Sequence, residues 1–152
     1  MSKESNKKLT LAEFIANKKE RKKNKPFRGT YYSKTEDCDI EFKKCDEEFF
    51  FYLMDKFPNA FSEKKEDMNI PEIIHAANRL VFECVMIENR SLKDKEVQQA
   101  LEVDLTNPQE IVNNTAKAFL EDFTERIELF GEILAFSGFG NNPTSKVEEI
   151  KN

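Results

Sequence analysis

One histidine and three cysteines are the residues whose chemistry would suit a metal ion. His75, Cys38, Cys45 and Cys84 together are the ligand set of a Cys3His zinc site. Structural zinc sites usually bring their ligands in pairs two to four residues apart, whereas six or more residues separate these four from one another. The spacing therefore predicts no metal site and no cofactor. It leaves three small apolar thiols and a partly buried His75.

Carboxylates are abundant, and a close pair could share the roles of general acid and general base. Examples of adjacent carboxylates are Glu47 and Glu48, Glu121 and Asp122, and Glu148 and Glu149. Neighbouring residues of a helix point in different directions, so none of these pairs forms an acid–base couple. The sequence also contains no glycine-rich phosphate loop and no serine or cysteine in a recognisable nucleophile motif. We therefore predict that the protein is not an enzyme.

The composition is that of one highly charged globular domain. The chain has 152 residues, of which 35% are charged and 39% are apolar, and this length is enough for a single core. It contains 14 Phe but only 3 Tyr and no Trp. Phenylalanine has no polar group, so it suits a core or an apolar interface. No apolar run approaches the roughly 18 residues that span a bilayer, and no signal peptide is evident, so we expect a reducing cytoplasm and no membrane contact.

The charge is divided unevenly along the chain. Residues 1–28 hold ten Lys and Arg against three Glu, a balance of +7, so with a net charge of −5 the remainder carries −12. A basic segment on an acidic body suits an anionic partner, self-association or nucleic acid. Nucleic acid is the less favoured interpretation, because the segment contains no motif in which aromatic residues regularly interleave the basic ones. We expect residues 1–8 to be flexible, residues 9–139 to form a single mainly helical domain with a basic first helix, and residues 140–152 to be a disordered tail.

The longest apolar-periodic stretch predicts a central helix over residues 70–89. Its apolar residues recur at three- and four-residue steps: Ile70, Ile73, Ile74, Ala77, Leu80, Val81, Cys84, Val85 and Met86. Pro71 falls in the first turn, where a missing N–H costs little. The apolar arc is wide, so this helix needs neighbours on more than one side. The predicted fold class is mainly α, a compact helical domain around this central helix with a small β-hairpin over residues 29–43.

Capping residues predict helices on either side of the hairpin. Thr10 and Glu13 form a capping box at the start of the first helix. Beyond Lys18 that helix has no apolar face, so we expect it to become ordered only against the rest of the chain or a partner. Asp46 caps a second helix, which Pro58 ends.

Further caps predict the helices of the second half. Ser91, with Asp94, marks the start of a short helix. Asn107 and Pro108 mark another start, because proline is favoured at the first helical position. That start leads either to one long helix or to a kinked pair, and Gly138 supplies the residue that ends it.

Three segments of the chain resemble the XkdN-like tail assembly chaperones of contractile-tailed phages and of phage-like particles in Firmicutes. They cover residues 8–22, 89–114 and 127–139. The matching motifs are a capped leucine-rich helix followed by Lys and Arg, a Leu-Lys-Asp-Lys-Glu run, an Asn-Pro helix start and a Gly-Glu-Ile sequence. In this chain the last three are Leu92 to Glu96, Asn107-Pro108 and Gly131-Glu132-Ile133.

The resemblance implies a non-enzymatic role in virion assembly. Proteins of this family bind the long coiled-coil tape measure protein, keep it in solution and help the tail tube protein to assemble around it. The resemblance therefore implies a protein of the bacterial host cytoplasm that is absent from the mature particle. It also implies that a longer form can arise by translational frameshifting.

Apolar residues of three predicted helices are the candidate partner-binding residues. A partner helix could lie in a groove lined by phenylalanines and flanked by charge. The candidates are Leu11, Phe14, Ile15, Phe49, Phe50, Leu53, Phe57, Phe123 and Phe130. The alternative hypothesis is a small helical regulator that binds nucleic acid through its basic N-terminal segment.

Overall fold

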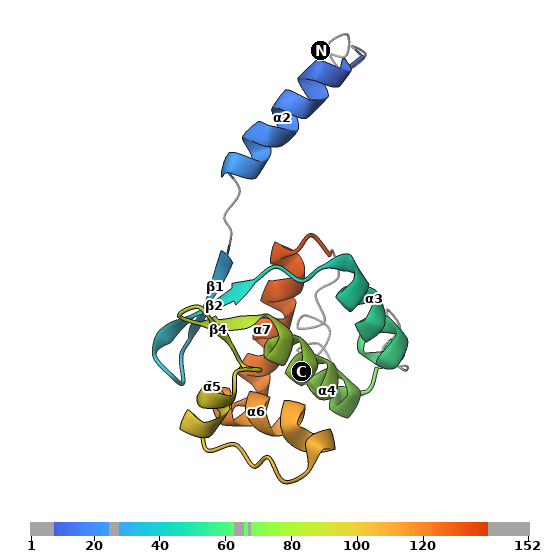
Figure 1. Ribbon diagram of the computed structural model, residues 1–152. Helices are drawn as coiled ribbons and strands as arrows, with labels where there is room; N and C mark the ends of the chain where they lie inside the picture. The colour runs from blue at the N-terminus through green and yellow to red at the C-terminus, as the bar shows by residue number, and fades with distance from the viewer. Residues whose placement is uncertain (1–7, 25–27, 63–65, 67, 140–152) are drawn as a thin grey trace.

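The computed structural model describes residues 8–24, 28–62, 66 and 68–139, and within these the fold is mainly helical with a small antiparallel sheet (Figure 1). The α-helices are α2 (Leu11–Asn24), α3 (Glu47–Lys56), α4 (Ile70–Cys84), α5 (Lys95–Ala100), α6 (Ile111–Phe119) and α7 (Phe123–Phe136). The strands are β1 (Arg28–Ser33), β2 (Cys38–Lys43), β3 (Val85–Ile87) and β4 (Arg90–Ser91), and two short 3-10 helices are η1 (Pro58–Ala60) and η3 (Pro108–Glu110). None of the helices described is long and apolar enough to cross a membrane. Of the predicted flexible residues 1–8, all but Lys8 lie outside the described residues, as does the predicted tail 140–152.

α4 packs against α6 and α7 (Figure 1). It begins at Asn69, whose side chain accepts a hydrogen bond from the Glu72 N–H, and Pro71 occupies the first turn. Most of its inward-facing side chains are fully buried: Ile73, Ala76, Ala77, Leu80 and Val81. This arrangement explains the wide apolar arc of the segment, because neighbours cover the helix on several sides.

The segment after Cys84 forms a strand, so the prediction of a helix over residues 70–89 is wrong beyond Cys84. Val85 has an extended backbone, with φ −65° and ψ 139°. It pairs antiparallel with Phe42, and Met86 pairs with Glu41. Val85 is β-branched, and such a residue fits a pleated, buried strand better than it fits the end of a helix.

The sheet has four strands in the order β1-β2-β3-β4, all antiparallel. In β2 the side chains alternate, because Ile40 and Phe42 point into the core while Asp39 and Glu41 face solvent. The sequence predicts a two-stranded hairpin over residues 29–43, and the structure adds β3 and β4 to it. Two strands alone are barely stable, and the added strands place the hairpin against the helical core.

A buried arginine holds the junction between α6 and α7. The chain forms a pair of helices here rather than one long helix, because Leu120 is extended and Asp122 caps α7. The Arg126 side chain donates from Nε to Asn78 Oδ1 at 2.7 Å. Its Nη1 donates to the carbonyl oxygens of Leu120 at 2.6 Å and Glu121 at 2.9 Å. These bonds satisfy backbone groups that the break leaves without helical partners.

α7 ends in a Schellman motif that brings a ring back onto α3. Gly138 adopts φ +90°, a left-handed conformation that favours glycine. The Gly138 N–H donates to the Ala135 carbonyl at 3.1 Å, and the Phe139 N–H donates to the Leu134 carbonyl at 2.9 Å. The Phe139 ring then stacks on Phe50, with ring centroids 4.1 Å apart and planes 2° apart.

α2 extends away from the rest of the protein (Figure 1). Its first turn is capped by Thr10, whose Oγ1 accepts from the Glu13 N–H at 3.2 Å and whose hydroxyl donates to the Glu13 carboxylate at 2.9 Å. Every residue from Lys8 to Arg21 is exposed, including Leu11 at 75%. The apolar stripe of α2 is therefore not buried against any other part of the described structure.

Candidate binding surfaces

The outer face of α3 carries exposed apolar side chains. The helix starts at Asp46, whose carboxylate accepts from the Phe49 N–H at 2.8 Å. Leu53 points into the core and is fully buried, whereas Phe51 is 59% exposed and Met54 is 41% exposed. We call Phe51, Tyr52 and Met54 the outer α3 surface. Side chains of this size usually bury against something, so their exposure marks a candidate interaction surface.

Two cations lie against the aromatic rings beside the outer α3 surface. The Arg79 guanidinium carbon lies 5.6 Å from the centroid of the Tyr52 ring and 6.0 Å from that of Phe49. The Lys56 Nζ lies 5.7 Å from the Tyr52 ring and 5.9 Å from the Phe57 ring. Cations over aromatic faces are attracted to them and hold the rings in place. The edge of the outer α3 surface is therefore both aromatic and positively charged.

The predicted partner-binding residues occupy different environments. On α2, the side chains of Leu11, Phe14 and Ile15 are exposed, and Phe123 is exposed at the start of α7. Two others, Leu53 and Phe130, are fully buried and belong to the core. The remaining three are partly buried against the core: Phe49, Phe50 and Phe57.

The sequence offered an indication that two residues of the outer α3 surface, Phe51 and Tyr52, would be exposed. Phe51 and Tyr52 fall off the apolar stripe, whereas Met54 belongs to it and is exposed nonetheless. The stripe consists of Phe49, Phe50, Leu53, Met54 and Phe57. An aromatic residue that falls off a buried stripe faces solvent once that stripe is packed. The off-stripe position was therefore the indication of exposure.

A groove of about 280 Å³ lies against β2 and β3, and its rim is acidic. The apolar part of its lining is Ile40, Met86, Ile87 and Phe119. The charged part consists only of carboxylates: Glu36, Asp39, Glu41 and Glu88. Cys38 also lines this groove and is exposed. The groove therefore suits a cationic or cationic–apolar ligand.

The three thiols and the histidine do not come together at one site. Cys45 and Cys84 are buried, and a hydrogen bond between the two thiols is the main cause that raises the pKa of Cys84, with burial second. His75 is exposed, which corrects the expectation that it is partly buried, and its Nδ1 lies 3.4 Å from Asn113 Oδ1. In the part of the chain that the structure describes, no three His, Cys, Asp or Glu side chains form a metal-binding group.

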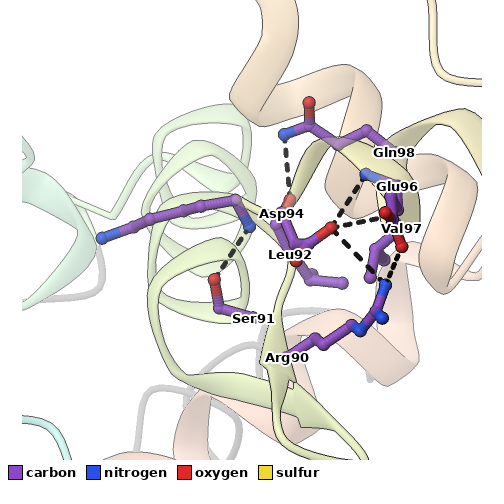
Figure 2. Close-up of polar contacts among 8 residues, drawn as sticks. Arg90, Ser91, Leu92, Asp94, Glu96, Val97 and Gln98 are labelled. Atoms are coloured by element: carbon purple, nitrogen blue, oxygen red, sulfur yellow. Dashed lines mark hydrogen bonds and ion pairs between the residues drawn. The ribbon is translucent and has the colours of Figure 1, made fainter.

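The Leu-Lys-Asp-Lys-Glu run joins β4 to α5 (Figure 2). Asp94 is the N-cap of α5, because its Oδ1 accepts from the Glu96 N–H at 2.8 Å and the Val97 N–H at 3.3 Å. Ser91, the predicted cap, instead accepts from the Lys93 N–H at 3.1 Å. Figure 2 also shows Arg90 reaching the Glu96 carboxylate.

The first residue of that run is fixed in the core. Leu92 is fully buried, and its carbonyl accepts from Gln98 Nε2 at 2.9 Å (Figure 2). Gln98 is itself buried, so this bond satisfies a polar side chain inside the protein. In this chain the run therefore caps and anchors α5.

Comparison of the chain with protein-family models, with curated proteins and with solved structures finds no match. The candidate surfaces are therefore defined by the geometry of this chain alone. They are the outer α3 surface, the acidic groove and the exposed α2. The first is apolar, the second is acidic and the third is basic with an apolar stripe.

Tyr31 and Glu125 connect the β1–β2 hairpin to α7. The Tyr31 hydroxyl donates to Glu128 Oε1 at 2.7 Å. The Ser33 hydroxyl and the Thr35 N–H donate to the buried Glu125 carboxylate at 2.5 and 3.0 Å. Burial first, and then the hydrogen bond and charge of Glu128, raise the pKa of Tyr31 above its usual value of 10.0. The neutral phenol therefore stabilises the folded state, and this contribution is complete below pH 10 and lost as the pH rises through the folded-state pKa.

Replacing Tyr31 by phenylalanine is expected to lower the free energy of unfolding by about 1 kcal/mol at about pH 8, because a hydrogen bond is lost. At about pH 11 the difference from the wild-type protein should be smaller, since only the wild-type unfolded state gains stability by ionising this phenol. Urea unfolding at the two pH values measures both differences. A difference that is the same at both would contradict the raised pKa.

Proposed function

We propose that the protein is a non-enzymatic tail assembly chaperone that binds a tape measure protein through the outer α3 surface. The sequence resemblance supports the class, and the solvent-exposed Phe51, Tyr52 and Met54 support the binding mode. A tape measure protein is long and carries apolar helical stripes that are exposed before the tube encloses them. A rigid apolar surface on a highly charged protein can cover such a stripe while the complex stays in solution.

The exposure of Phe51 and Met54 is the observation that carries this proposal. α3 is apolar on both sides, because Leu53 fills the core while these two side chains face solvent. The opposite side of the helix is already anchored by the stacking of Phe50 on Phe139 and by the contact of Phe50 with Phe61. The outer side chains are therefore presented on a fixed helix, which reduces the entropy lost on binding.

Co-expression with the tape measure protein tests the proposal. We expect the wild-type chain to raise the soluble yield of the tape measure protein several-fold, and the double variant Phe51→Ser, Met54→Ser to lose most of this gain. Tyr32→Thr is the matched control, because Tyr32 is an exposed aromatic residue on β1, outside the outer α3 surface. Substitutions at exposed positions usually change stability by about 0.5 kcal/mol or less, and urea unfolding of each variant checks this.

Two results would contradict the proposal, one its function and the other its binding surface. If the wild-type chain leaves the soluble yield unchanged, the chaperone function is wrong. If the wild-type chain raises the yield and the double variant raises it equally, the function stands and the outer α3 surface is not the site. The proposal further places the protein in the bacterial cytoplasm, assisting the tail tube protein, and predicts its absence from finished particles by immunoblot.

The exposed α2 favours a second candidate function, which is nucleic-acid binding. Its residues Lys18, Lys19 and Arg21 face solvent. Duplex DNA binding through these side chains would weaken steeply with added salt, because neutralising phosphates releases counterions. Fluorescence anisotropy with labelled DNA at several salt concentrations measures the slope. A chain that shows no binding at low salt excludes this candidate.

A further inference from the structure

A second pocket, of about 210 Å³, lies beside the outer α3 surface and is lined by three basic side chains. They are Lys56 from α3 and His75 and Arg79 from α4. The other lining residues are Phe57, Gln109, Val112 and Asn113. No carboxylate lines this pocket in the described structure, although Glu110 lies near it, 3.5 Å from Asn113 Nδ2.

The two cations of this pocket, Lys56 and Arg79, have no anionic partner within the described part of the chain. None of Lys56, His75 and Arg79 takes part in an ion pair there. The Arg79 Nε is buried and has no hydrogen-bond partner among the residues that the structure describes. Buried donors without a partner are rare and costly in proteins, so the interactions within the chain leave part of this guanidinium's donor capacity unused.

The surroundings of Arg79 hold its guanidinium in an orientation that suits the binding of an oxyanion. The rings of Phe49 and Tyr52 hold its guanidinium in one orientation by cation–π contacts. A fixed guanidinium presents N–H donors in the planar arrangement that matches a carboxylate or a phosphate. His75 and Asn113 meet across the pocket, which adds polar groups from α4 and α6.

We propose that this pocket binds the carboxylate of an acidic side chain on a partner protein chain. Phe57 and Val112 give it an apolar wall that suits the aliphatic stem of a glutamate better than a fully hydrated phosphate. Tyr52 belongs to the outer α3 surface and contacts both Arg79 and Lys56. A partner helix on the outer α3 surface would therefore place an apolar stripe on Phe51, Tyr52 and Met54 and a carboxylate in the adjacent pocket.

This proposal specifies how the protein would bind a partner chain, and it rests on the proposed chaperone function only for the identity of that partner. Its test uses the purified chain without a tape measure protein, so the two can fail separately. His75 is the only histidine of the chain, so its ring protons give isolated proton NMR signals from the pocket itself. The probes are N-acetyl-glutamate amide, the uncharged N-acetyl-glutamine amide and inorganic phosphate, each at constant pH and ionic strength.

We expect the glutamate derivative to shift the His75 signals in a saturable way and the glutamine derivative to leave them unchanged. Lys56→Gln and Arg79→Lys should each weaken this binding by about threefold or more, since each removes or displaces a donor. Lys95→Gln, on α5 and outside the pocket, is the matched control and should bind as the wild type does.

Each other outcome overturns the proposal. Equal shifts with the glutamate and glutamine derivatives would show that charge is not recognised. Tighter binding of phosphate than of the glutamate derivative would assign the pocket to a different oxyanion. Circular dichroism checks that Lys56→Gln and Arg79→Lys fold as the wild type does. If both folded variants bind the glutamate derivative as tightly as the wild type, the carboxylate binds outside this pocket.

Discussion

Replacing Arg126 by alanine is expected to lower the free energy of unfolding by about 3–5 kcal/mol. The side chain is only 3% exposed and makes three hydrogen bonds, to Asn78 Oδ1 and to the carbonyls of Leu120 and Glu121. Truncation leaves these acceptors inside the protein without donors. Burial lowers the pKa of the Arg126 guanidinium, and the charge of Asp122 opposes this effect. An arginine nevertheless remains protonated in proteins, so the interaction persists at neutral pH.

Urea unfolding followed by circular dichroism measures this loss. Arg90→Ala is the matched control, because Arg90 is exposed and pairs with Glu96 at the surface, where ion pairs contribute little. Its effect should stay below about 1 kcal/mol. Arg126→Lys should recover only part of the loss, since an ammonium group cannot reproduce the planar arrangement of donors. A loss below about 1 kcal/mol for Arg126→Ala would show that water replaces the guanidinium at the junction.

Replacing Gly29 by alanine is expected to cost about 2–3 kcal/mol, because the added methyl group has no space. A Cβ on Gly29 would lie 2.5 Å from Phe42 Cζ, 2.6 Å from Phe42 Cε1 and 3.1 Å from Phe136 Cδ1. Phe42 is buried and packs edge-to-face on Phe136, with ring centroids 5.4 Å apart. The added methyl group would therefore disturb the contact between Phe42 of the sheet and Phe136 of α7.

A double-mutant cycle with Phe42→Leu tests this cause. The shorter leucine side chain vacates the position of the ring edge, so Gly29→Ala should cost clearly less in the Phe42→Leu background than alone. Gly138→Ala is a useful contrast, because a Cβ there meets nothing within 4 Å. Its cost of about 1 kcal/mol would come only from the φ of +90°. An additive cycle for Gly29 and Phe42 would rule out the steric explanation.

Local signals allowed most of the helices to be predicted. A cap such as Asp46 or Asn107 acts within its own first turn, so the sequence contains the whole interaction. β3 could not be predicted in the same way. The apolar run from Val85 to Ile87 fits the face of a helix as well as a strand, and its pairing partner Phe42 is remote in sequence.

The candidate surfaces depend on tertiary contacts to an even greater degree. The exposure of Met54 follows from which side of α3 packs on the core, because helical periodicity alone places Met54 on the same apolar stripe as Phe50 and Phe57. The pocket at Arg79 forms because α3, α4 and α6 meet there. No spacing in the sequence brings Lys56, His75 and Arg79 together.

The different environments of the three thiols have a practical consequence for solution work. Cys45 and Cys84 are enclosed in the core, while Cys38 opens to solvent on the wall of the acidic groove. A maleimide fluorophore should therefore attach to the native chain at one defined position without any mutagenesis. Its emission would report a second molecule arriving at the β2–β3 face and would leave the outer α3 surface unlabelled.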